Sequence, residues 1–273
     1  MLLLRGSNGW SLALAVLSAV SVPAAGLAAD PVIPLPRAHA HNDYAHSRPL
    51  LDALAHGFCS VEADIFLRDG KLLVGHSQRE LRPDRTLAAL YLDPLKQRAV
   101  AHGGRIYPGG PPFTLLIDIK SDGQRTYAAL REVLARYRGI LSSVTDGRLT
   151  SRAVTVVISG NRPLTAIAAD SPRYAGIDGR LTDLDSNLPA HLMPLISDHW
   201  GRHFRWPGDG PMPADQRTRL RAIVAKVHAH GRRVRFWATP DRPAMWAALD
   251  AAGVDLINTD DLAGLEQFLL DRR

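Results

Sequence analysis

The chain has 273 residues and a single cysteine, Cys59, so it cannot form a disulfide within itself. Cys59 lies in an apolar stretch, where we expect it to be buried rather than to act as a nucleophile. Beyond the N-terminal leader, no segment is apolar over the roughly 20 residues that a membrane span requires. The sequence also lacks a strong internal repeat, a linker and a low-complexity tract. The number of domains must therefore be inferred from the pattern of strands and helices.

A concentrated positive charge is also missing. The formal net charge is +6, but the Lys and Arg residues are scattered along the chain instead of forming a run. Nucleic-acid-binding proteins usually gather their basic residues on one face. The sequence therefore predicts no nucleic-acid partner, and its mild positive charge favours solubility or attraction to anionic substrates.

The N-terminus has the pattern of a secretory signal peptide. Arg5 precedes an apolar core at residues 10–20, and small residues fill positions 23–29 before Asp30. We predict a signal peptide over residues 1–29, a mature domain over residues 30–273, and a secreted or periplasmic location. An uncleaved N-terminal anchor is the alternative.

An acidic strand and its hairpin form the centre of the predicted fold. The apolar run 59–67 ends at Asp69-Gly70, and a second short run leads through residues 71–74 to His76, as in a strand, a tight turn and a second strand. Side chains alternate along a strand, so Glu62 and Asp64 face the same side. Two neighbouring carboxylates in an apolar strand repel each other and need a compensating cation.

The alternation of strands and helices predicts a single-domain α/β fold, a TIM (β/α)8 barrel. About eight strands each head a strand–helix unit, the number at which a parallel sheet closes into such a barrel. The expected strands cover residues 37–42, 59–67, 113–120, 153–159, 174–178, 192–197, 233–238 and 254–258.

Three consecutive strands carry polar residues spaced two apart. Because their apolar neighbours suit packing against outer helices, these polar side chains must face the barrel interior, where TIM-barrel active sites are assembled. His76, after the hairpin, is placed to fold back over the same opening. The pairs are His39 and His41, Glu62 and Asp64, and Asp118 and Lys120.

These residue types suit metal-assisted phosphodiester cleavage. The oxygen ligands Glu62, Asp64 and Asp118 favour one divalent cation, Mg²⁺ or Ca²⁺, over zinc. His41 and His76 can divide the acid and base roles, since imidazole titrates near neutral pH. Lys120 is suited to hold a phosphate oxygen.

The sequence resembles the glycerophosphodiester phosphodiesterases and the wider phosphatidylinositol-phospholipase-C-like phosphodiesterase superfamily. The resemblance covers nearly all of the mature chain, and its first segments look most like the branch that contains altered inheritance of mitochondria protein 6. It implies that Glu62, Asp64 and Asp118 bind the metal and that two histidines act as acid and base. The matching segments are Glu62-x-Asp64, the Asp69-Gly70 turn ending in His76, Ile117-Asp118-Ile119-Lys120, and residues 236–239 and 253–260.

The sequence departs from the family pattern at the first strand. The usual His-Arg-Gly is replaced by His41-Asn42-Asp43, so the phosphate-gripping arginine is missing. Asn42 and Arg180 are the candidates to take over part of its role. Which of His39 and His41 corresponds to the family's first histidine stays open, and we prefer His41 because it lies nearer the carboxyl end of the strand.

The resemblance implies a small-molecule phosphodiester substrate, with glycerophosphodiesters or the head groups of lysophospholipids as leading classes. It does not fix whether water or a hydroxyl of the substrate attacks phosphorus. A phospholipid substrate would bring the protein into transient contact with a membrane surface.

Two other functions fit part of the sequence. His39-x-His41 also resembles amidohydrolases and polymerase-and-histidinol-phosphatase domains, in which both histidines bind zinc or another transition metal. In that case further ligands would come from His102, His191, His199 and His203.

The second alternative is a non-catalytic barrel that binds a sugar or lipid head group. Aromatic side chains would form its binding platform. The candidates are Trp200, Phe204, Trp206 and Trp237.

Overall fold

The computed structural model describes Leu2 and residues 32–273. The predicted signal peptide therefore lies outside the described residues except for Leu2. Within the described part of the chain, no helix is both long enough and apolar enough to cross a membrane. Cys59 is buried, as predicted.

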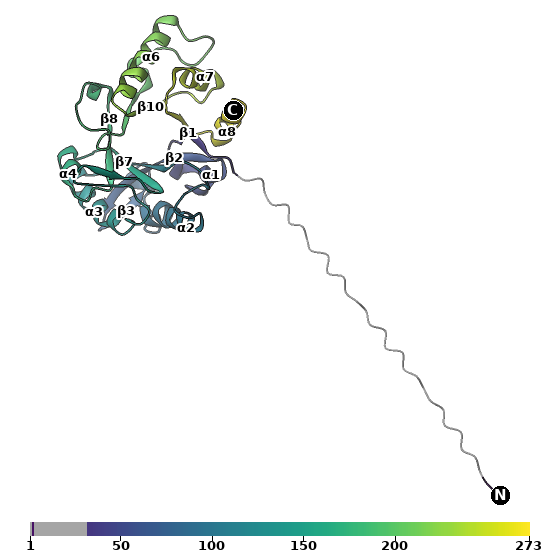
Figure 1. Ribbon diagram of the computed structural model, residues 1–273, viewed down its shortest axis with the longest axis vertical. Coiled ribbons are helices and arrows are strands. Elements are labelled where there is room, and N and C mark those ends of the chain that lie inside the picture. The colour runs from purple at the N-terminus through teal and green to yellow at the C-terminus, as the bar shows by residue number, and fades with distance from the viewer. Residues whose placement is uncertain (1, 3–31) are drawn as a thin grey trace. The chain divides into compact units, whose positions relative to one another are not determined.

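Eight parallel strands close into a barrel, which confirms the predicted fold (Figure 1). β1 pairs with β11 on one side and with β2 on the other, so the first strand joins the two ends of the sheet. All eight expected strands are present, with boundaries shifted by a few residues. They are β1 Leu35–Ala40, β2 Phe58–Arg68, β4 Phe113–Ile119, β7 Val154–Gly160, β8 Ala175–Gly179, β9 Leu195–His199, β10 Arg233–Trp237 and β11 Leu256–Thr259.

The predicted hairpin extends the barrel at β2. β3, Lys71–Val74, pairs antiparallel with the second half of β2. The turn between them is Asp69-Gly70, and both residues have positive φ, 48° and 74°. This is the backbone conformation that two-residue hairpins require and that Asp-Gly adopts readily. The hairpin delivers His76 to the carboxyl end of the barrel.

The helices lie on the outside of the barrel strands (Figure 1). Asp122 caps α3 by accepting a hydrogen bond from the backbone N–H of Arg125, and Asp261 caps α8 in the same way through Gly264. The helices are α1 Leu51–Ala55, α2 Asp93–Ala101, α3 Gly123–Ala135, α4 Leu164–Ala169, α5 Trp200–His203, α6 Ala214–Ala229, α7 Pro243–Ala252 and α8 Leu262–Leu270, with short irregular turns η1 Asp43–Ala45, η2 Gln78–Glu80, η3 Ala88–Leu92 and η4 Leu181–Asp183.

Alternation along β4 separates the two faces of the barrel wall. Leu115, Ile117 and Ile119 are at most 1% exposed and belong to the large core shared with the helices. Leu116 faces the other way and packs in a small cluster with Val157, Leu195 and Leu256, which come from three other barrel strands. Since Asp118 follows Leu116 on the same face, this apolar cluster forms the base beneath the polar carboxyl end.

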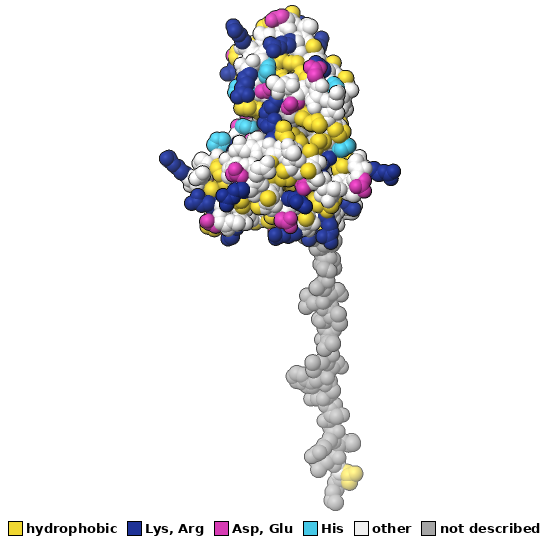
Figure 2. All heavy atoms as spheres, turned by 90° about the vertical axis from the view of Figure 1, so that its left-hand side faces the viewer, with side chains coloured by type: hydrophobic (Ala, Val, Ile, Leu, Met, Phe, Trp, Pro, Cys, Tyr) yellow, Lys and Arg dark blue, Asp and Glu magenta, His cyan; other side chains and the backbone are white. Residues whose placement is uncertain are grey.

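Two features differ from the sequence expectation. A short hairpin, β5 Ser143–Thr145 and β6 Arg148–Thr150, precedes β7 and was not predicted. The segment with Trp200, Phe204 and Trp206, which the second alternative treats as an accessible binding platform, begins with helix α5, and its aromatic side chains are buried. On the face of the molecule in Figure 2, Lys and Arg are mixed with acidic side chains.

Candidate active site

A cavity of about 340 Å³ opens at the carboxyl ends of the barrel strands. Eight of the nine predicted site residues line it. The ninth, Asp64, is 1% exposed and contacts two of the lining side chains, Lys120 and His76. The lining residues are His41, Asn42, Glu62, His76, Asp118, Lys120, Ser159, Arg180, Arg235, Trp237 and Ala238.

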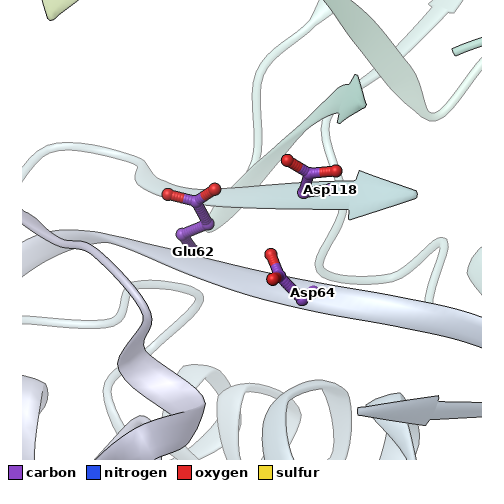
Figure 3. Close-up of side chains that lie close together, drawn as sticks. All are labelled: Glu62, Asp64 and Asp118. Atoms are coloured by element: carbon purple, nitrogen blue, oxygen red, sulfur yellow. The ribbon is translucent and has the colours of Figure 1, made fainter. Parts of the chain in front are cut away.

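The three predicted metal ligands come together. Each of Glu62, Asp64 and Asp118 offers one carboxylate oxygen, and these oxygens lie within 4.8 Å of one another (Figure 3). The strand register explains this proximity, because Asp64 of β2 stands opposite Asp118 of the neighbouring β4. Glu62 lies two residues earlier on the same face of β2. Among the described residues, this is the group with the composition and spacing to hold a metal ion.

The carboxylates fit a cation. Oδ1 of Asp64 and Oδ1 of Asp118 are both buried and meet no hydrogen-bond donor among the residues that the structure describes. Burial, reinforced by the charge of Glu62, raises the pKa of Asp64 to about 6, and burial also raises the pKa of Asp118. Buried acceptors without partners are costly, and a divalent cation would satisfy both oxygens.

The charge balance of the site also suits a divalent cation. Lys120 Nζ lies 3.2 Å from Asp64 Oδ2 and 3.1 Å from Asp118 Oδ2, and Arg235 Nη1 lies 2.8 Å from Glu62 Oε2. Two cationic side chains thus face three carboxylates and leave one negative charge uncompensated. A divalent ion would make the site positive, which suits a phosphodiester anion.

Arg235 is the principal site residue that the sequence analysis missed. Its side chain is 3% exposed, and Nη1 donates to Glu62 Oε2 and, at 3.3 Å, to Asn258 Oδ1. Burial would favour the neutral acid, but the charge of Arg235 outweighs it and holds the pKa of Glu62 well below its ordinary value. Arg235 therefore keeps Glu62 ionised in the barrel interior and places a guanidinium in a site that lacks the arginine expected directly after His41.

His39 belongs to the same buried network. Its Nε2 lies 2.6 Å from Arg235 Nη1, which can only donate, so the proton must be on Nδ1, which lies 2.7 Å from Ser60 Oγ. Burial, together with the positive charge of Arg235, lowers the pKa of His39 to about 3. His39 is therefore neutral, and it does not line the cavity.

This arrangement argues against the zinc-hydrolase alternative. His39 is already engaged by Arg235, and two of the histidines that would supply further ligands, His102 and His191, have other partners. His102 lies 2.9 Å from the carbonyl oxygen of Ile106, and His191 bonds to Arg173. No histidine takes part in the metal-ligating group found among the described residues.

His41 and His76 flank the cavity, each with Nδ1 beside a carboxylate. His41 Nδ1 lies 2.9 Å from Asp260 Oδ1, and His76 Nδ1 lies 3.1 Å from Asp64 Oδ2. Burial disfavours the charged form of His41, but the hydrogen bond to Asp260 and the charge of Glu62 outweigh it and raise the pKa of His41. With each Nδ1 held, Nε2 of both rings is left for a substrate.

Tyr44 links three of these groups. Its hydroxyl lies 2.6 Å from Asn42 Oδ1, 2.8 Å from Asp64 Oδ2 and 3.1 Å from His76 Nδ1. Burial and the charge of Asp64 raise the pKa of Tyr44, so the phenol stays protonated. Its single proton can be donated to only one acceptor at a time. The three contacts of the Tyr44 hydroxyl hold Asn42 and the ring of His76 in position relative to Asp64.

Arg180 and Trp237 complete the opposite wall. Arg180 Nη1 donates to Asp178 Oδ2 at 2.8 Å, which holds the guanidinium at the cavity. The rings of Trp237 and His199 pack in a T-shaped arrangement, with their centroids 4.5 Å apart. The proposed platform of four aromatic residues is wrong, because Trp200, Phe204 and Trp206 are at most 5% exposed and only Trp237 reaches the cavity.

Sequence comparison identifies the family. The model of the AIM6-like phosphodiesterase domain matches residues 28–102 and 109–177, and that of the glycerophosphoryl diester phosphodiesterase family matches residues 233–263. The chain belongs to the AIM6-like phosphodiesterase family. Altered inheritance of mitochondria protein 6 of Eremothecium gossypii is 32% identical over 270 residues, which cover 86% of this chain and 69% of that protein. The Saccharomyces cerevisiae (strain S288c) protein of the same name is 30% identical over 282 residues, which cover 85% of this chain and 70% of that protein.

Solved structures share the fold that this family adopts here. A glycerophosphodiester phosphodiesterase from Parabacteroides distasonis superposes with a TM-score of 0.53 and 15% identity, over 86% of this chain and 97% of that one. An Oleispira antarctica phosphodiesterase in complex with the product sn-glycerol-3-phosphate superposes with a TM-score of 0.52 and 16% identity. The superposition covers 87% of this chain and 97% of that one. At these identities the likeness shows the barrel fold.

Gly160 provides a test of the metal site. A Cβ at this position would lie 2.0 Å from Asp118 Oδ1, and φ is +67°. We expect Gly160→Ala to displace the Asp118 carboxylate and to weaken Mg²⁺ or Ca²⁺ binding by roughly tenfold or more, measured by calorimetry. Gly109→Ala is the matched control, because Gly109 has a φ of +69° but open space around it. Equal metal affinity in the two variants would contradict the assignment.

The Arg235 network makes a prediction about stability. Arg235→Met leaves Glu62 ionised without its partner, so we expect the free energy of unfolding in urea to fall by about 3–5 kcal/mol. The double variant Glu62→Leu, Arg235→Met removes the stranded charge and should recover at least half of that loss. A double variant no more stable than Arg235→Met would show that the pair is not coupled.

Proposed function

We propose that this chain is a metal-dependent phosphoric diester hydrolase that acts on glycerophosphodiesters or on lysophospholipid head groups. The observation that carries the proposal is the meeting of Glu62, Asp64 and Asp118 at one cavity with two histidines, each of which has its Nδ1 beside a carboxylate. Membership in a phosphodiesterase family supports the reaction class. The predicted signal peptide supports a secreted or periplasmic location.

The three carboxylates would hold one divalent cation, Mg²⁺ or Ca²⁺. When bound, such an ion supplies positive charge that stabilises the phosphorane-like transition state. Lys120 and Arg180 are placed to bind the non-bridging phosphate oxygens, and Arg235 keeps Glu62 charged for its role as a ligand. Asn42 and Trp237 line the remaining wall and would contact the substrate's alcohol groups.

His41 and His76 would move the protons. One imidazole accepts the proton of the attacking hydroxyl as the new P–O bond forms, and the other donates a proton to the leaving alcohol oxygen as the old P–O bond breaks. Asp260 orients His41, and Asp64 together with Tyr44 orients His76. His39 is not available for either role, because its Nε2 accepts a hydrogen bond from Arg235.

Removal of the metal tests this function directly. We expect chelation to abolish hydrolysis across a panel of glycerophosphodiesters and lysophospholipids, and re-addition of Mg²⁺ or Ca²⁺ to restore it. Glu62→Ala should lower kcat/KM by roughly 100-fold or more in the presence of either ion. Hydrolysis that persists at full rate in the chelated protein or in Glu62→Ala would overturn metal dependence.

The contact between Asp260 and His41 predicts a change in the pH–rate profile. Asp260 raises the pKa of His41 through a hydrogen bond and through its negative charge, so Asp260→Asn should lower the pKa of His41. The limb that His41 controls should move to lower pH, the alkaline limb if it is the acid and the acidic limb if it is the base.

Glu266→Gln is the matched control for this experiment. It removes the similar contact of His56 with Glu266, away from the cavity, and should leave the profile unchanged. A profile that does not move in Asp260→Asn would remove His41 from the reaction.

A further inference from the structure

A second cavity, of about 490 Å³, adjoins the active site and is not used by the proposed chemistry. Asn42 and His76 line both cavities, so the two meet at these side chains. The second cavity is bounded by the loop after β1 and by the segment that follows β3. Its other lining residues are Tyr44, Ala45, Val74, Gly75, Glu80, Arg82 and Arg85.

The charged groups of this second cavity are held to different degrees. Arg85 donates to the carbonyl oxygen of Tyr44. Glu80 accepts from the backbone N–H of His76 and from Ser77 Oγ, both at 2.8 Å. The exposed side chain of Arg82 makes no hydrogen bond or ion pair within the described part of the chain. The cavity thus presents one unengaged guanidinium beside a second guanidinium and a fixed carboxylate.

The position of His76 connects this cavity to the reaction, and the inference therefore rests on the proposed function. An alcohol group that exchanges a proton with His76 Nε2 must lie against that ring. Its remaining atoms have room in the second cavity, because His76 is part of the wall of both. The charges there would then act on that alcohol group and not on the phosphate.

We propose that the second cavity is a subsite for an alcohol group that carries a carboxylate, such as the serine of a glycerophosphoserine. Its carboxylate pairs with Arg82 and Arg85, and its ammonium group faces Glu80. Guanidinium groups bind carboxylates through paired, charge-assisted hydrogen bonds. Ethanolamine has the same ammonium group without the carboxylate, so the two alcohols differ by the group that the arginines would bind.

The experiment compares glycerophosphoserine with glycerophosphoethanolamine in the metal-loaded protein. The wild-type chain should hydrolyse the serine diester with a kcat/KM about tenfold higher, the ratio expected for one charge-assisted contact at a partly exposed site. In Arg82→Gln this ratio should fall to about two or below. Arg79→Gln is the matched control, because Arg79 is exposed in the same turn but does not line the cavity. Its ratio should match the wild type.

Failure of the subsite and failure of the proposed function give different results. Two outcomes would overturn the subsite proposal without affecting the hydrolase proposal. The first is hydrolysis of both diesters by the wild type at equal kcat/KM. The second is an equal drop, in Arg79→Gln and Arg82→Gln, of the ratio of kcat/KM for the serine diester to that for the ethanolamine diester. A chain that cleaves neither these two diesters nor any other member of the glycerophosphodiester and lysophospholipid panel would overturn the hydrolase proposal. In that case calorimetry tests the subsite by binding alone. The serine diester should still bind more tightly to the wild type than to Arg82→Gln. Equal affinities for the two proteins would overturn the subsite proposal.

Discussion

The ion pair between Arg235 and Glu62 is the contact on which the active site depends. Three carboxylates face the interior of the barrel, above an apolar layer that offers them no hydrogen bonds. A buried carboxylate without a partner would bind a proton and lose its value as a metal ligand. Arg235 prevents this for Glu62, and Lys120 shares its charge between Asp64 and Asp118. The remaining negative charge is what makes the site suited to a divalent cation.

Arg235 also distinguishes the two neighbouring histidines, one within the first strand and one just beyond its end. His39 is drawn into the buried network by Arg235 and Ser60, so it is a neutral structural residue with a pKa of about 3. His41 lies just beyond the strand end, where Asp260 raises its pKa and the cavity is within reach. Two residues of identical chemistry, spaced two apart, thus have pKa values that their surroundings shift in opposite directions. The arginine that the family pattern has directly after the first histidine is absent, and the cavity carries an arginine from β10, Arg235.

Much of the site was predictable because side chains alternate along strands. That rule placed Glu62, Asp64, Asp118 and Lys120 on one face, and the structure brings them together through the register of β2 with β4. The same rule applies to β10, where Val234 and Phe236 are fully buried and Arg235 shares a face with Trp237. Arg235 was not predicted, because the inward-facing polar pairs that indicated the site lie on the first three strands, whereas Arg235 lies on β10. Tyr44 carried no such signal, because it lies in a turn outside any periodic element.

The sequence by itself determined the barrel, its strand order and the identity of the acidic cluster, because hydrophobic periodicity and strand–helix alternation are local properties of the chain. Only the tertiary structure decided which histidine reaches the cavity, that Trp200, Phe204 and Trp206 are buried, and that a second cavity meets the first at His76. These outcomes depend on contacts between residues far apart in sequence, such as Arg235 with His39 and Asp260 with His41. No pattern within one segment records such contacts, since each is set by the closure of the barrel.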